Sequence, residues 1–168
     1  IRFMPNGSLL ALSFSEADGK THITSYKPSS TAMDWSFTVS GFAEYTDISP
    51  DGNRVALGMD TGAVFVADTR SRTAVEMAAP ASVLSSLSFC PTGTMLLGST
   101  DEGDLILWDV TTKSIISRPL TGLDEPPTAS FSPTGDRIAV FSGAVVYTLT
   151  CNSDDWERVL KAIMADSR

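Results

Sequence analysis

Residues 87–110, which read LSFCPTGTMLLGSTDEGDLILWDV, contain three short apolar runs separated by two tight turns. In the first turn, Pro91 fixes φ at the first corner and Gly93 supplies the positive φ that closes a short hairpin loop. The second turn spans 100–103, and an alternating run at 104–109 follows it. Three runs joined by two tight turns predict three antiparallel strands in a meander.

The first turn of this unit recurs along the chain, each time as a proline followed two residues later by a glycine. The four pairs are Pro5 and Gly7, Pro50 and Gly52, Pro91 and Gly93, and Pro133 and Gly135. Successive prolines are 45, 41 and 42 residues apart. A period of about 40 to 45 residues with four strands per unit is typical of a propeller blade.

The repeat resembles the WD-repeat family of β-propellers. Trp108 and Asp109 stand at the place that gives the family its name, and the pair Ala67 and Asp68 matches half of it. The stretch 118–135 is similar to the link between consecutive bacterial-type repeats. The resemblance covers residues 1 to about 150 and implies an all-β fold of four consecutive blades.

The implied organisation is a partial propeller over 1–150 followed by a C-terminal helix over 151–168. The expected blades lie near 1–41, 42–82, 83–125 and 126–150, and the last has strands at 128–131, 137–141 and 144–150. The family's usual ring has seven blades, so four blades favour a part of a larger ring over a small closed one. We expect a C-terminal fragment of a longer protein, in which an upstream part of the same polypeptide completes the ring and pairs with the edge strand 144–150.

Well-formed repeats of this family also contain a buried hydrogen-bond network. It joins the Trp of the third strand, a Ser or Thr of the second, an Asp in the turn and a His from a Gly-His step. Trp108 and Thr100 stand at matching positions, but Glu102 replaces the Asp and Leu123 replaces the His. The resemblance therefore implies weak polar tethering within a blade, so that apolar packing between blades holds the fold.

The last residues predict an amphipathic helix over 153–165. Its apolar positions follow the i, i+3, i+4, i+7, i+8 pattern and are Trp156, Val159, Leu160, Ile163 and Met164. A helix this short needs a surface to cover its apolar stripe. We expect it to dock on the edge of the last blade, or in a partner's groove, which makes Trp156, Leu160 and Ile163 candidate partner-binding residues.

Composition excludes several classes of partner. The 20 acidic and 12 basic residues give a net charge of −8, which disfavours nucleic acid and anionic membranes. No apolar run approaches 18 residues and no leader opens the chain, so we expect neither a membrane span nor a secretion signal. Cys90 and Cys151 have no metal-ligand or redox spacing and indicate reduced thiols in the cytoplasm.

The chain offers no reactive constellation. His22 is its only histidine, there is no GxSxG motif, and the glycines lie in hairpin turns rather than in a phosphate cradle. We expect the acidic side chains of the hairpin tip 101–104 to be solvated and not to bind a cation. We therefore expect no enzyme activity and no cofactor or metal, and a scaffold or ligand-sensing module with a protein partner.

Two alternatives remain at this point. One is the sensor end of a bacterial multidomain regulator with a kinase, protease or nucleotide-hydrolysing domain upstream. The other is part of a propeller enzyme whose catalytic groups lie in absent blades.

Overall fold

The computed structural model describes the chain except for residues 29, 31, 81, 122, 124 and 152–168. The described residues form four antiparallel sheets and no helix. In each sheet, strands that are consecutive in the chain are neighbours. The predicted all-β meanders are confirmed. The predicted helix, with Trp156, Leu160 and Ile163, lies outside the described residues except for Cys151, which is not helical.

The first sheet contains β1 (Arg2–Phe3), β2 (Leu9–Ser15), β3 (Lys20–Tyr26) and β4 (Met33–Ser40), and the second contains β5 (Ala43–Ile48), β6 (Arg54–Met59), β7 (Val64–Asp68) and β8 (Thr73–Glu76). The third contains β9 (Leu84–Phe89), β10 (Met95–Thr100), β11 (Leu105–Asp109) and β12 (Ser114–Leu120), and the fourth contains β13 (Thr128–Phe131), β14 (Arg137–Ser142) and β15 (Val145–Thr150).

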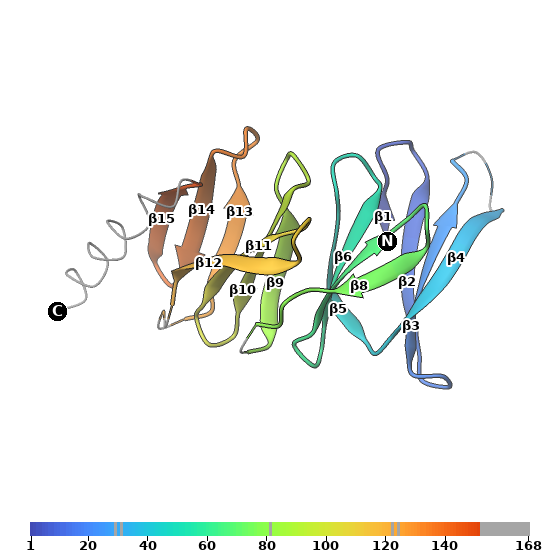
Figure 1. Cartoon of the computed structure of the whole chain (residues 1–168), viewed down its shortest axis with the longest axis horizontal. Coiled ribbons are helices and arrows are strands. Elements are labelled where there is room, and N and C mark those ends of the chain that lie inside the picture. Colours follow the sequence, from blue (N-terminus) through green and yellow to red (C-terminus); the bar gives the residue numbers. More distant parts are fainter. Residues whose placement is uncertain (29, 31, 81, 122, 124, 152–168) are drawn as a thin grey trace.

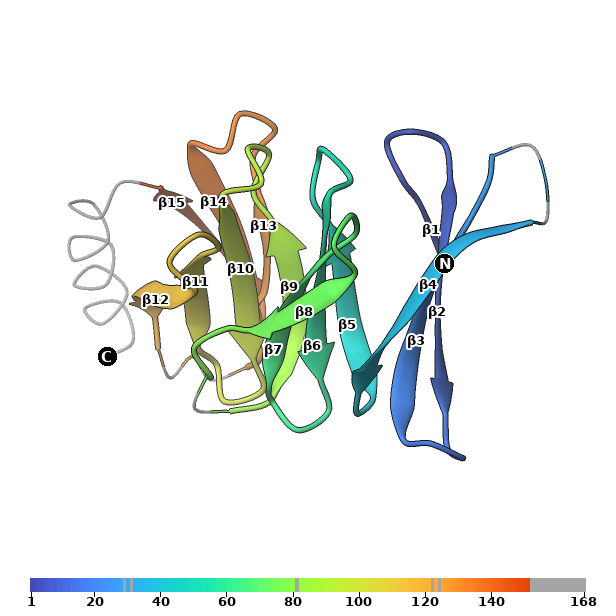
Figure 2. The same cartoon turned by 45° about the vertical axis from the view of Figure 1, so that its right-hand side comes forward.

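The four sheets stand side by side in chain order (Figure 1). The same row, seen from another side in Figure 2, places the first and fourth sheets at opposite ends. Both views show an open row rather than a closed ring.

Three apolar cores lie between successive sheets, because strand residues alternate between the two faces. On β11, Leu105 and Leu107 belong to the core shared with the fourth sheet, whereas Ile106 and Trp108 belong to the core shared with the second. All four side chains are buried. A sheet with two apolar faces is covered only by a neighbour on each side, so the row is held together between its sheets.

The two outer sheets expose apolar side chains. Phe141 and Val146 are cross-strand neighbours on β14 and β15, and they are 53% and 67% exposed. At the other end of the row, Phe3 on β1 is 78% exposed. These outer faces have no covering element among the described residues.

Candidate binding site between the first and second sheets

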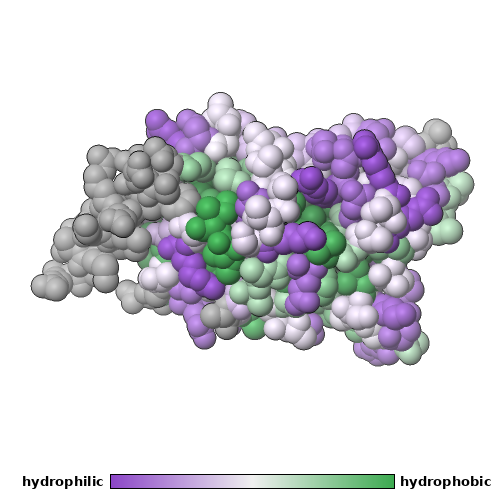
Figure 3. All heavy atoms as spheres, in the orientation of Figure 1, coloured by the Kyte–Doolittle hydropathy of each residue, from purple (hydrophilic) through white to green (hydrophobic). Residues whose placement is uncertain are grey.

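The four Pro–Gly turns build one end of the molecule. Gly7, Gly52, Gly93 and Gly135 have φ values of 83°, 72°, 71° and 76°, which only glycine adopts without cost. Each donates its N–H to the carbonyl three residues earlier, at 2.8–2.9 Å. All four turns lie at the upper ends of the sheets in Figure 1, where hydrophilic side chains gather over the first two sheets (Figure 3).

Successive turns touch one another across the sheets. A Cβ atom on Gly52 would lie 3.0 Å from Pro5 Cδ, and one on Gly135 would lie 3.3 Å from Pro91 Cδ. The Gly93 position faces Pro50 at 3.7 Å. Pro133, in the last turn, has no fifth turn to face in the described chain. The prolines and glycines singled out in the sequence therefore form one continuous row.

The turn between β7 and β8 is shaped by Asp68. Its carboxylate accepts the backbone N–H groups of Arg70 at 2.8 Å and Ser71 at 2.7 Å. These bonds, that from Ser71 first, hold the pKa of Asp68 below its ordinary value. Arg72 closes the turn with φ 60° and donates its N–H to the Asp68 carbonyl at 2.9 Å. The turn fixes where two arginine side chains leave the backbone.

The turn between β11 and β12 repeats this geometry. Asp109 accepts the N–H groups of Thr111 and Thr112 at 2.7 and 2.8 Å, and Lys113 has φ 61°. The second residue of the Trp108–Asp109 pair therefore caps a turn. A cation four residues after each aspartate, repeated at an interval of 41 residues, is a signal for this turn that lies outside the Pro–Gly and Trp–Asp motifs.

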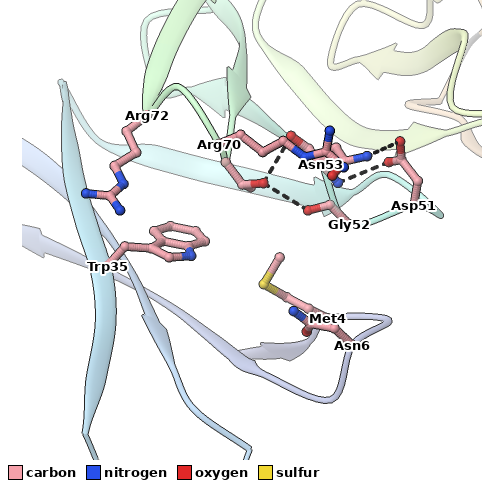
Figure 4. Close-up of a pocket in the computed structure, with 9 residues that line it drawn as sticks. Met4, Asn6, Trp35, Asp51, Gly52, Asn53, Arg70 and Arg72 are labelled. Carbon is pink, nitrogen blue, oxygen red and sulfur yellow. Dashed lines mark hydrogen bonds between the residues drawn. The ribbon is translucent and has the colours of Figure 1, made fainter.

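A hollow of about 340 Å³ lies beside the Pro5–Gly52 contact, between the first and second sheets. It is lined by Met4, Asn6, Trp35, Asp51, Gly52, Asn53, Thr69, Arg70 and Arg72. Figure 4 shows Trp35 reaching into the hollow from β4 and Arg72 extending toward its indole from the β7–β8 turn. Met4 points into the same space from the first Pro–Gly turn, while Asp51 and Asn53 lie along the far edge.

The charge of the hollow differs from that of the chain. Among the described residues, Arg70 and Arg72 are exposed and form no side-chain hydrogen bond or ion pair. Asp51 is occupied by its own turn, because Ser49 donates to it at 2.6 Å and Asn53 at 2.7 and 3.0 Å. These bonds, led by that from Ser49, lower the pKa of Asp51 to about 2. The hollow thus holds two guanidiniums that have no hydrogen-bonded partner among the described residues, although Arg70 also interacts electrostatically with Asp68. The protein as a whole has a net charge of −8.

Trp108 and Thr100 lie away from this hollow, and their hydrogen bonds run to different groups. Trp108 is fully buried, and its Nε1 donates to the carbonyl of Ala78, in the connection between the second and third sheets, at 2.8 Å. The Thr100 hydroxyl accepts the N–H of Asp104 at 3.0 Å. Trp108 therefore ties two sheets together, whereas Thr100 ties a turn within one sheet.

Polar contacts also run between the innermost strands. The Asp47 carboxylate on β5 accepts the N–H of Phe89 on β9 at 2.7 Å and lies 3.4 Å from the Arg2 guanidinium on β1. Arg54 donates to the carbonyl of Gly93 at 3.1 Å. One carboxylate thus connects three sheets, which the sequence motifs did not indicate.

No histidine or cysteine is among the described residues that line the hollow. His22 lies on β3 with its Nε2 3.3 Å from Asp18, and both cysteines are free. In the part of the chain that the structure covers, no three metal-binding side chains gather, and no helix has the length and apolarity of a membrane span. The arrangement offers recognition of an anionic and partly apolar group.

Comparisons with known proteins identify the architecture only. No family model and no curated protein matches the chain. Among the solved structures, 1161 chains are similar in fold, which points to a widespread architecture. One is hydrazine synthase from Kuenenia stuttgartiensis, with a TM-score of 0.65 and 14% sequence identity. The match covers 89% of this chain and 47% of that one, so this chain spans about half its length.

Proposed function

We propose that this chain is a part of a WD-repeat-like β-propeller and serves as a protein-interaction module. The observation that carries the proposal is the hollow at the turn end, which Arg72 and the indole of Trp35 line on one side and Arg70 lines on the side of Asn53. Arg and Trp are among the residues that dominate the binding energy of protein interfaces. The two free thiols fit a reducing compartment, and we place the protein in the cytoplasm.

The outer faces support the second half of the proposal, that further blades of the same polypeptide complete a ring. Phe141 and Val146 on one side and Phe3 on the other would be covered by additional sheets. Among the described residues, the edge strand β15 pairs only with β14. We expect a strand from an upstream part of the same polypeptide to pair with its other edge. The similar solved chain is about twice as long.

Selection of a random peptide library against the immobilised full chain tests the interaction module. Enriched peptides should share a consensus, and their binding should slow amide hydrogen exchange at 4–8, 49–54 and 68–73. Protection confined to the opposite turns, at 60–62 and 101–103, or the absence of any consensus, would contradict the proposal.

Sedimentation velocity tests the exposed outer faces. The full chain should self-associate reversibly through these apolar surfaces. Phe141→Ser should weaken the association, whereas Ala139→Ser, on the same face of β14, should change it little. A monomer at all concentrations would argue against further blades.

A further inference from the structure

We propose that the hollow between the first and second sheets binds an acidic segment of a partner protein. A carboxylate of that segment pairs with Arg72, Arg70 adds positive charge on the Asn53 side of the hollow, and an adjacent apolar side chain packs on Trp35 and Met4. The inference rests on the proposed interaction function and names the class of its ligand.

Arg72 is positioned before any ligand arrives. Its backbone is held by the bond to the Asp68 carbonyl at 2.9 Å, and Asp68 is itself fixed by two further N–H groups of the turn. The guanidinium has no partner among the described residues, and the planar fork of arginine matches the two oxygens of a carboxylate. An unpaired guanidinium on a backbone held by its turn therefore favours a planar anion.

Trp35 gives the hollow an apolar wall next to the charge. Its side chain is half-buried, stacks on Phe37 with the ring centroids 5.8 Å apart, and faces the buried Met4 across the hollow. A partner that offers only charged groups would leave Trp35 and Met4 in contact with water. An acidic residue followed by an apolar one uses both surfaces.

Asp51 and the two asparagines of the rim favour a peptide over a phosphate group. The Asp51 carboxylate stays ionised at neutral pH and repels a phosphate dianion more strongly than a single carboxylate. Peptide N–H groups, in contrast, can donate to Asp51 and to the side-chain carbonyls of Asn6 and Asn53. A phosphate offers fewer donors to these acceptors.

The third sheet provides a matched control. Lys113 stands in the turn equivalent to that of Arg72, with φ 61° against 60°. It borders a smaller hollow, of about 130 Å³, that also contains Asp68 and has no aromatic wall. A cation in the same kind of turn is therefore present in a hollow that Arg54 also lines but that has no indole.

Isothermal titration of the full chain with the peptide acetyl-Gly-Glu-Leu-Asp-Glu-Leu-Gly-amide tests the proposal. The peptide should bind. A control peptide with Gln and Asn in place of Glu and Asp should have an affinity at least about tenfold lower. Arg72→Asn and Arg70→Gln should each lower the affinity for the acidic peptide by about tenfold, whereas Lys113→Asn should leave this affinity unchanged. Asn tolerates positive φ, so Arg72→Asn keeps the turn, and an unchanged melting temperature confirms it.

Three results would overturn the assignment. These are equal binding of the acidic and amide peptides, equal losses in Arg72→Asn and Lys113→Asn, and displacement of the peptide by an equal concentration of inorganic phosphate. If library peptides still protect the turn end while the acidic peptide does not bind, only the ligand class is wrong. If neither the library peptides nor the acidic peptide binds at the turn end, the proposed interaction function is wrong as well.

Discussion

The interface between the second and third sheets keeps only a small hollow of about 130 Å³, whereas the interface between the first and second sheets keeps one of about 340 Å³. Trp108 on β11 faces the second sheet and is fully buried, with its Nε1 bonded to Ala78. The equivalent residue on β7 is Ala67, which faces the first sheet. A small side chain stands there in place of an indole, and Trp35 enters this core from the outer strand β4, only half-buried.

This difference separates what the repeat determines from what it leaves open. The period and the turns are shared by both sheets, so the backbone is the same kind of meander in each. The two interfaces differ in where the indole lies, because Trp108 is buried in the core, whereas Trp35 lines the hollow and is half-buried. Ala67 is buried and does not line the hollow, which is bordered by the turns instead.

The largest expected effect is that of removing the indole that fills the tight interface. Trp108→Ala should lower the free energy of unfolding by about 3–5 kcal/mol, because it leaves a cavity and an unpaired Ala78 carbonyl. Trp35→Ala should cost only about 1 kcal/mol, since the indole already contacts water. Urea unfolding of both variants measures the difference, and equal losses would remove the distinction between the two interfaces.

A smaller effect is expected from crowding the same interface. A Cβ on Gly98 would lie 2.8 Å from Cζ3 of Trp108 and 3.1 Å from Leu84, so Gly98→Ala should cost about 1–3 kcal/mol. Combining it with Trp108→Phe should give a loss smaller than the sum of the two single losses, because the shorter ring makes room. Strictly additive losses in a double-mutant cycle would show that the indole is not the obstacle.

At the interface between the first and second sheets, two glycine substitutions distinguish the effect of the contact between Pro–Gly turns from the effect of backbone strain. Gly52→Ala and Gly19→Ala both place a side chain at positive φ, at 72° and 65°, which costs about 1–2 kcal/mol. Only Gly52 also faces Pro5 at 3.0 Å, whereas nothing lies within 4 Å of a Cβ on Gly19. Gly52→Ala should therefore be the more destabilising, and the thermal melts of the pair should differ. Coincident melts would mean that the turn row contributes nothing to the first interface.

Local features could be predicted from the sequence, and contacts across sheets could not. The strand Thr128–Phe131 has the bounds expected from turn signals and apolar runs, and Arg137–Ser142 ends one residue later than expected, because those signals act over a few residues. The hollow depends on Trp35, Asp51 and Arg72, which come from three separate turns and strands. The period of the repeat does not predict that the first and second sheets leave a hollow between these residues. The Asp–cation spacing of the β7–β8 turn was the one local clue to the site.

The smallest expected effect concerns acid and again distinguishes the two interfaces. Asp51 in the second Pro–Gly turn has its pKa lowered to about 2, and the equivalent residue of the third sheet is Thr92, which does not titrate. A carboxylate with a lowered pKa stabilises the fold fully above its ordinary value of about 3.9, and this contribution is lost as the pH falls toward about 2. The loss is modest because Asp51 is exposed.

The difference in unfolding free energy between the wild type and Asp51→Asn should therefore be constant above about pH 5 and shrink between about pH 4 and pH 2. Thr92→Ala, in the equivalent turn, should shift stability by the same amount at every pH. Denaturant titrations across this range measure both differences. A pH-independent difference for Asp51→Asn would mean that the Ser49 and Asn53 bonds do not favour the ionised carboxylate, and the rim of the hollow would then carry no fixed negative charge in acid.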